Sequence, residues 1–164
     1  MEKIFDYMKK NFELDKIDKK ILNILQKDNQ ITNQALADEV GLSAPSCLRR
    51  VRQLHEEKII CQNVAIVDPK KVGFSFIVFL NISLERQRED ILENFERKVL
   101  AQPEVTQCYF VSGDFDYFLV VVVSDVHAYH DFVRRVFAND QNIKVFRSQF
   151  ALNRVKYSTK IDIE

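Results

Sequence analysis

The sequence predicts an α+β protein with two domains, and two successive patterns support this prediction. Residues 14–57 hold three short helical patterns, and a glycine-containing turn joins the second to the third, as in a helix-turn-helix (winged-helix-like) domain. From residue 74 the patterns alternate in the order β-α-β-β-α-β, which is the order of a ferredoxin-like sandwich. We therefore place the helical domain, with an N-terminal extension, at 1–58, a hinge strand at 59–68 and the sandwich at 69–164.

The first helical pattern begins with a capping signal. Asp15 is expected at the N-cap, and Asp18 follows three residues later, as in a capping box. Three helices of this length would enclose a minimal core, for which we expect the following residues: Ile21, Leu25, Leu36, Val40, Leu48 and Val51. Because such a core is small, we expect the domain to depend on something else for its stability.

The turn between the second and third helices has the residues that a tight connection requires. Gly41 follows the last apolar position of the second helix, where a residue that tolerates positive φ ends a helix at little cost. Ser43 is a favoured N-cap residue. Pro45 lies in the first turn of the next helix, where its missing N–H is not needed. These signals predict a helix-turn-helix over 32–57.

The third helix has two unlike faces when its residues are placed at about 100° intervals. One side is an apolar stripe made of Ala44, Cys47, Leu48, Val51 and Leu54. The opposite side carries Ser46, Arg49 and Gln53, flanked by Arg50 and Arg52. Between Ser43 and His55 there are three arginines and no acidic residue.

This polar face is a candidate surface for double-stranded DNA. Arginine and glutamine pair bidentately with guanine and adenine edges, so we expect Arg49 and Gln53 to read bases, and Arg50 and Arg52 to hold phosphates. Further expected contacts are Ser46, Ser43 after its capping role, and Thr32 and Asn33 through a helix N-terminus. The face pattern alone fits a solvated amphipathic helix equally well, and the turn and cap around it favour DNA.

The net charge qualifies this expectation. The chain carries 24 Lys+Arg and 24 Asp+Glu, so its formal net charge is zero, which is unusual for a DNA-binding protein. The positive charge is concentrated on 43–53. We therefore expect modest affinity from each subunit and strong binding only when several subunits occupy one DNA.

The second half supplies the sandwich. We expect strands at 74–84, 105–112, 117–124 and 144–152, and helices at 87–100 and 125–138. The β-branched stretch 59–67 is read as the hinge strand. Four strands backed by two helices leave one sheet face uncovered, and its Phe- and Val-rich strands predict a dimer interface there. The alternative is a thicker core, but no further segment of the chain is left to cover this face.

Three separated motifs resemble the Lrp/AsnC family of transcription regulators. They are LDKIDKKILNILQKDNQIT at 14–32, ALADEVGLSAPSCLRRVRQLHEEKII at 35–60 and VSGDFDYFLVVVV at 111–123. The resemblance implies an N-terminal DNA-binding domain and a C-terminal domain that forms homodimers by sheet stacking. It also implies assembly to a tetramer or octamer and an amino-acid effector bound between dimers. One departure is Lys58, because the family usually has glycine there, and lysine in a left-handed cap costs about 1 kcal/mol.

The resemblance also implies that the 113–117 loop lines the amino-acid site. The expected ligand-binding residues are Gly113, Asp114, Phe115, Asp116 and Tyr117, completed by Gln149 and Ala151 on the last strand. Asp114 or Asp116 could meet an α-ammonium, and loop N–H groups an α-carboxylate. The alternative is that the loop simply closes a tight hairpin. The Phe- and Val-rich surroundings favour an apolar or sulfur-containing amino acid.

Other classes of function find little support in the sequence. No apolar run is long enough to span a membrane, and the N-terminus does not resemble a signal peptide, so we expect a cytoplasmic protein. The three cysteines are far apart, and His127 and His130 have no evident third ligand, so we expect no metal and no cofactor. No catalytic constellation appears. Two rivals remain: a sensor module whose helical head docks a protein, and an enzyme on the ferredoxin-like fold.

Overall fold

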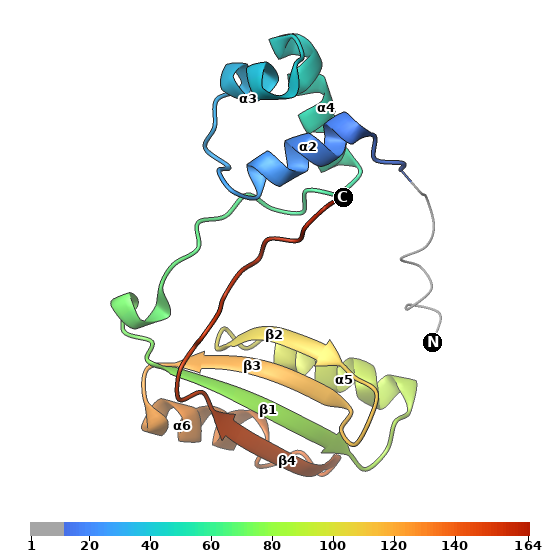
Figure 1. Ribbon diagram of the computed structural model, residues 1–164. Helices are drawn as coiled ribbons and strands as arrows, with labels where there is room; N and C mark the ends of the chain where they lie inside the picture. Colours follow the sequence, from blue (N-terminus) through green and yellow to red (C-terminus); the bar gives the residue numbers. More distant parts are fainter. Residues whose placement is uncertain (1–11) are drawn as a thin grey trace. The chain divides into compact units, whose positions relative to one another are not determined.

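The computed structural model describes residues 12–164, so most of the predicted N-terminal extension, 1–11, lies outside the described residues (Figure 1). The described chain forms two compact units. The helical unit runs to Ala65 and includes Lys156–Glu164, which we call the tail segment. The sandwich unit is Ile66–Val155. The tail segment was expected in the sandwich domain, and it packs instead with the helices.

Within 12–65 the helical unit contains three helices: α2 (Lys16–Leu25), α3 (Asn33–Val40) and α4 (Ala44–Glu56). The predicted capping box at the start of α2 is confirmed. The Asp15 carboxylate accepts hydrogen bonds from the N–H groups of Ile17 and Asp18, each at 2.8 Å, and the Asp18 carboxylate accepts one from the Asp15 N–H at 3.2 Å. These bonds fix where α2 begins.

The core of the helical unit differs in part from the prediction. The predicted residues Ile21, Leu36 and Val40 are buried, and Leu25 and Val51 are half-buried. Leu48 is 38% exposed, so its assignment to the core was wrong. On α4 the fully buried residues are Cys47 and Leu54 instead. Leu48 lies about 100° further round the helix than Cys47, which is enough to turn it from the core toward solvent.

The predicted turn between α3 and α4 is confirmed in its main feature. Gly41 has φ of 77°, in the left-handed region, and the N–H of Leu42 donates to the Ala37 carbonyl at 2.9 Å. Ser43 occupies the N-cap position of α4, but its hydroxyl donates to the Ser46 hydroxyl at 2.9 Å and caps no backbone N–H. The turn is therefore held by backbone geometry.

The predicted hinge strand is not formed. Residues 61–68 carry no strand, and Val64, Ile66 and Val67 are exposed. A strand needs a hydrogen-bonded neighbour, and none of the strands described between residues 12 and 164 pairs with this segment. A β-branched stretch without a partner stays an irregular connection.

Lys58 departs from the family's glycine, which left open whether the helix ends differently here, and the structure gives it a left-handed conformation with φ of 56°. The Ile59 N–H donates to the Leu54 carbonyl at 2.9 Å, and the Lys58 N–H donates to the His55 carbonyl at 3.0 Å. These two bonds form a Schellman motif at the end of α4. Lysine therefore occupies a conformation that glycine adopts without steric cost.

We expect Lys58→Gly to stabilise the helical unit by about 1 kcal/mol, because it removes the left-handed penalty. Urea unfolding of the full chain, followed by a helix-sensitive signal, measures this change. The matched control is Glu57→Gly at the preceding residue. Glu57 has φ of −77°, so this substitution relieves no strain and is expected to be neutral or destabilising. Equal changes in the free energy of unfolding for the two substitutions would contradict the view that the left-handed Lys58 is strained.

The sandwich unit has the predicted β-α-β-β-α-β order. Its elements are β1 (Phe76–Leu84), α5 (Glu89–Leu100), β2 (Val105–Phe110), β3 (Tyr117–Val123), α6 (Val126–Val136) and β4 (Ile143–Phe150). The sheet order is β2-β3-β1-β4, with antiparallel neighbours throughout. Figure 1 shows α5 and α6 on the same face of the sheet. None of the helices described in 12–164 is long and apolar enough to cross a membrane.

The two faces of this sheet are both apolar but differ in burial. The helix-covered face contributes fully buried residues such as Leu80, Ile82 and Leu119. The alternate positions point the other way and are only half-buried. Among them Phe79 and Phe118 stack at 5.8 Å between ring centroids. Within 66–155 no helix covers this open face (Figure 1), which leaves it available to another chain.

Candidate DNA-reading helix and effector loop

The exposed face of α4 carries three long polar side chains that are free to bind. Arg49, Arg52 and Gln53 are exposed, and within the described chain their side chains make no hydrogen bond or ion pair. Arg49 and Gln53 are four residues apart, so they lie on the same face of the helix. Ser46 lies on this face one turn earlier and is half-buried. This arrangement presents a guanidinium and a carboxamide together from one rigid helix.

Arg50 has a different environment from its neighbour Arg49. Its guanidinium donates to the Asp15 carboxylate at 2.7 Å and to the Asp18 carboxylate at 2.8 Å. The Asp18 side chain is only 6% exposed, and that of Arg50 is 27% exposed. The predicted phosphate contact is therefore in competition with two carboxylates of α2. In the free protein Arg50 joins the middle of α4 to the start of α2.

The electrostatics of this cluster agree with its geometry. The N–H of Asp18, followed by the Arg50 guanidinium, lowers the pKa of the Asp15 carboxyl below its ordinary value. Hydrogen bonds to Asp18 and then Asp15 raise the pKa of Arg50. Asp15 and Arg50 therefore stabilise each other in the charged form.

We expect the helical unit to lose stability in acid. A carboxyl whose pKa is lower in the folded state contributes stability above its unfolded pKa, and this contribution disappears as the pH falls through the folded value. For Asp15 the loss therefore occurs below about pH 4. Thermal unfolding between pH 3 and 6 measures it. Asp15→Asn should flatten this dependence, and an unchanged pH profile in that variant would exclude Asp15 as a source.

Thr32 and Asn33 both have structural partners at the start of α3. The Thr32 hydroxyl accepts the N–H of Ala35 at 3.2 Å, which makes Thr32 the N-cap. The Asn33 carboxamide donates to the Ala44 carbonyl at 2.8 Å and so ties α3 to the first turn of α4. Their contact with phosphate stays a prediction.

The 113–117 loop at the β2–β3 connection is held by Asp116. Its carboxylate oxygens accept hydrogen bonds from the Leu84 N–H and the Gln87 carboxamide, both at 2.6 Å. Gly113 has φ of 125°, a conformation that favours glycine. Asp114 is exposed, and its carboxylate makes no bond within residues 12–164. Of the two predicted ammonium partners, Asp116 is thus already used in holding the loop to the end of β1, whereas the Asp114 carboxylate is free.

Arg147 is a functional candidate that sequence reasoning missed. Its guanidinium lies 5.4 Å from the centroid of the Phe115 ring, in cation–π geometry. Arg147 is on β4 opposite Asn81 of β1, and the hairpin tip reaches it across the open face. The signal is long-range, because only the register of β4 on β1 brings residue 147 to the loop.

Tyr117 does not belong to the exposed surface of the loop, which corrects its predicted position. Its side chain is 1% exposed on the helix-covered face. Its hydroxyl donates to the Glu96 carboxylate at 2.9 Å. Burial, reinforced by this carboxylate, raises the pKa of Tyr117. Strand alternation from Phe118, which faces the open side, puts Tyr117 inward.

Gln149 and Ala151 are not brought to the loop within one chain. Gln149 lies opposite Phe79, and the Ala151 N–H donates to the Ile77 carbonyl at 2.9 Å, near the start of β1. The loop meets the other end of β1, where the Asp114 carbonyl accepts from the Ser83 hydroxyl. From Ser83, Phe79 is four residues of strand away and Ile77 six, or about 13 and 20 Å, so Gln149 and Ala151 form a group separate from the loop.

A surface cavity of about 390 Å³ lies between α5 and the segment before β4, and it borders Leu84. Its acidic residues are already paired. Asp90 bonds to Arg88, and Asp140 bonds to Lys98, both at 2.9 Å. The cavity therefore presents no free carboxylate for an ammonium group, which favours the loop over this cavity as an effector site.

In the described part of the chain, no group of three or more His, Cys, Asp and Glu side chains is placed to hold a metal. The free cysteines lie apart, with Cys47 buried and Cys61 exposed. Burial raises the pKa of the Cys108 thiol to about 11, so this cysteine stays protonated and packs as an apolar residue.

An arginine-bearing helix in a helix-turn-helix, followed by an antiparallel sheet domain, defines the class of DNA-binding regulators with a separate sensor domain. Comparison with known proteins agrees with this class. Residues 14–60 match the model of a winged helix-turn-helix DNA-binding domain, and 77–161 match the Lrp/AsnC ligand binding domain. The chain belongs to the Lrp/AsnC family and is a transcription regulator, not an enzyme.

Individual relatives match over almost the whole length. An HTH-type transcriptional regulator of Sinorhizobium fredii is 40% identical, over 93% of this chain and 90% of the relative. The leucine-responsive regulatory protein of Escherichia coli is 37% identical, over 93% of both chains. Among solved structures, an AsnC family regulator from Agrobacterium tumefaciens has a TM-score of 0.85, 39% identity and coverage of 90% and 96%. A Neisseria meningitidis regulator in complex with L-Met has a TM-score of 0.84, 34% identity and coverage of 91% and 96%.

Proposed function

We propose that this regulator changes its DNA affinity and its assembly when it binds a free amino acid. The observation that carries the effector assignment is the pairing of Phe115 with Arg147 beside the free Asp114 carboxylate. A zwitterion needs a cation for its carboxylate, an anion for its ammonium and a wall for its side chain. Arg147, Asp114 and Phe115 supply these three in that order.

The amino acid that best fits such a wall is apolar or sulfur-containing. Support comes from two relatives: the Neisseria structure contains L-Met, and the Escherichia coli protein is called leucine-responsive. We therefore propose L-methionine and L-leucine as the first candidates. Gly113 contributes exposed backbone to the carboxylate side.

On the DNA side, we propose that Arg49 and Gln53 read base edges and that Arg52 holds a phosphate. Ser46, Ser43, Thr32 and Asn33 lie around them and contribute polar groups to the DNA backbone. Arg50 is assigned to holding α4 against α2, because its two ion pairs occupy the guanidinium. The domain limits we propose are a helical domain at 1–58 that also includes the tail segment, an irregular connection at 59–68 and a sandwich domain at 69–155.

The active assembly is proposed to be a homodimer that joins into a tetramer or octamer. The open apolar face around Phe79 and Phe118 is a suitable dimer surface. In such an assembly Gln149 and Ala151 of one subunit could approach the effector loop of another. A chain with no net charge then gains its DNA affinity because several helical domains of one assembly bind the same DNA together.

We expect Arg147→Gln to weaken amino-acid binding about tenfold or more, because a charge-assisted hydrogen bond to the α-carboxylate is lost. Calorimetric titration with L-methionine and with L-leucine measures the dissociation constants. The control is Arg88→Gln, which removes an arginine of the same unit whose side chain is 70% exposed. Equal affinities of the wild type and Arg147→Gln would remove Arg147 from the site.

A mobility shift with the DNA upstream of the chain's own gene, at two salt concentrations, tests the regulator against its rivals. A DNA reader gives a specific shift that weakens as salt rises. A sensor module that docks a protein gives none. That second candidate is disfavoured because its docking helix would normally present apolar anchors instead of arginines.

A further inference from the structure

We propose that the tail segment (Lys156–Glu164) is a structural part of the DNA-reading unit and serves as its second tether to the sensor domain. The inference deepens the proposed function, on which its regulatory meaning rests. It is carried by hydrogen bonds and packing inside the helical unit. Figure 1 shows the end of the chain beside α2.

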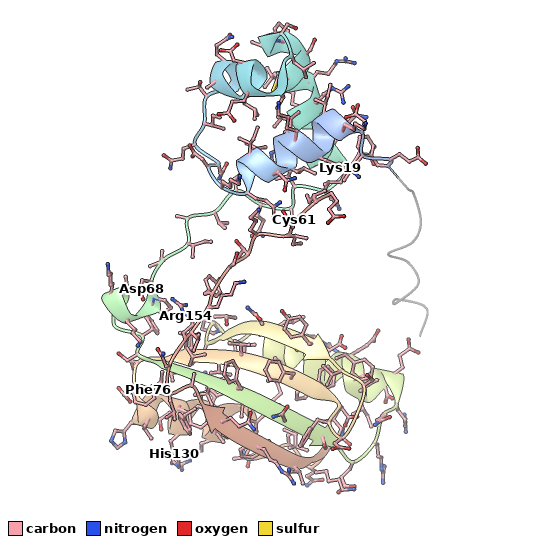
Figure 2. All side chains as sticks on the ribbon, in the orientation of Figure 1. Lys19, Cys61, Asp68, Phe76, His130 and Arg154 are labelled. Carbon is pink, nitrogen blue, oxygen red and sulfur yellow. The ribbon has the colours of Figure 1, made fainter. Side chains whose placement is uncertain are left out.

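Three side chains, two from α2 and one from its C-cap residue Gln26, form hydrogen bonds with the backbone of the tail segment. The Gln26 carboxamide donates to the Ile161 carbonyl at 2.9 Å and accepts the Ile161 N–H at 2.7 Å. The Asn23 carboxamide donates to the Ile163 carbonyl at 2.8 Å. Lys19, one turn earlier and labelled in Figure 2, donates to the Glu164 carbonyl. Asn23 and Gln26 are three residues apart and Lys19 four before Asn23, so one face of α2 makes all these bonds.

An apolar anchor accompanies these bonds. Ile163 is half-buried and packs against the core of the helical unit, together with Ile59 and Ile60 at the exit of α4. The side chain of Ile161, two positions earlier, is 71% exposed. This alternation means that Ile163 packs with the helices, whereas Ile161 contributes only its backbone. The small three-helix core thus gains an apolar residue from the far end of the chain.

The docking gives the helical unit two covalent connections to the sandwich unit. The chain leaves the helical unit after Ala65 and returns to it at Lys156. One connection leads from the helical unit into β1, and the other leads from β4 back to the helical unit. β1 and β4 are neighbouring strands of one sheet. A single irregular linker leaves a unit free to rotate, whereas a second attachment restricts that rotation.

The second tether starts from the strand that carries the proposed effector contact. Arg147 lies on β4, and the chain continues from Phe150 through 151–155 into the tail segment. A shift of β4 on effector binding therefore reaches α2 through a short covalent path. This path would control how far apart two DNA-reading units can lie in a dimer.

Hydrogen exchange of the full-length protein tests the docking directly. We expect the Ile161 amide to be protected in the wild type and to exchange about tenfold faster in Ile163→Ser, because the anchor is removed. Ile161→Ser is the matched control, since its side chain is exposed, and it should keep the protection of its own amide and of α2. Exchange of the Ile161 amide at the rate of an unstructured peptide in the wild type would overturn the docking.

A lengthened connection tests the tether separately. Inserting Gly-Ser-Gly-Ser after Leu152, whose side chain is 98% exposed, extends the path and leaves every docking contact in place. We expect affinity for a duplex with two half-sites to fall about tenfold and affinity for one half-site to stay unchanged. Leu152→Ser is the control without added length. Unchanged affinity for both duplexes would overturn the tether.

The two arms also separate this inference from the proposed function. A wild type that binds neither duplex would refute the proposed DNA reading, while hydrogen exchange would still decide the docking. A wild type that binds DNA but shows an unprotected tail segment would refute the second tether alone.

Discussion

Arg49→Ala is expected to abolish most specific DNA binding while leaving the assembly intact. The Arg49 guanidinium is exposed and makes no bond within the described chain, so its removal costs the fold little. A bidentate contact to guanine contributes about 1–3 kcal/mol of discrimination, and the proposed dimer would lose it at both half-sites. Fluorescence anisotropy with the chain's own upstream DNA, at physiological salt, measures the loss. Light scattering checks that the assembly is unchanged.

The control for Arg49→Ala is Arg88→Ala, which removes the same charge from an exposed site on the sandwich unit. This control should bind DNA like the wild type. If Arg49→Ala retained wild-type affinity for the specific duplex, α4 would not be the reading element.

Arg50→Met is expected to act on stability instead of on DNA reading. It keeps the aliphatic stem but leaves the buried Asp18 carboxylate without its cation. We expect the free energy of unfolding of the helical unit to fall by about 1–2 kcal/mol. The loss is this small because about a quarter of the Arg50 side chain is exposed, so solvent screens the ion pair. Urea unfolding, followed by a helix-sensitive signal, measures the change.

Adding Asp18→Asn to Arg50→Met should recover part of this loss, because the amide still accepts the capping-box hydrogen bond and carries no charge. Arg49→Met is the matched control and should unfold like the wild type. A double variant no more stable than Arg50→Met, or equal losses from the two arginine variants, would contradict the assigned difference between these neighbours.

The features that the sequence predicted best are local ones. The capping box at Asp15 and the left-handed Gly41 each depend on a few consecutive residues. The order of strands and helices followed from periodicity in the same way. Such features need no knowledge of the distant chain, so residue patterns suffice.

The features that it missed depend on contacts between distant residues. The helix face distinguished Arg49 from Arg50, but only the approach of Asp15 and Asp18 shows that Arg50 is held in two ion pairs. Arg147 reaches Phe115 through strand register, and the tail segment reaches α2 from 135 residues away. The sequence did indicate that the three-helix core was too small to stand alone, but not which segment completes it.

Binding of an amino acid is expected to change how this protein holds DNA. The most direct measurement is an anisotropy titration of the upstream duplex with wild-type protein, in the absence and presence of L-methionine or L-leucine, at two salt concentrations. We expect specific, salt-dependent binding whose affinity shifts about fivefold or more with one of these amino acids, a coupling typical of allosteric proteins. Specific binding with the same affinity in the absence and in the presence of both amino acids would contradict this expectation.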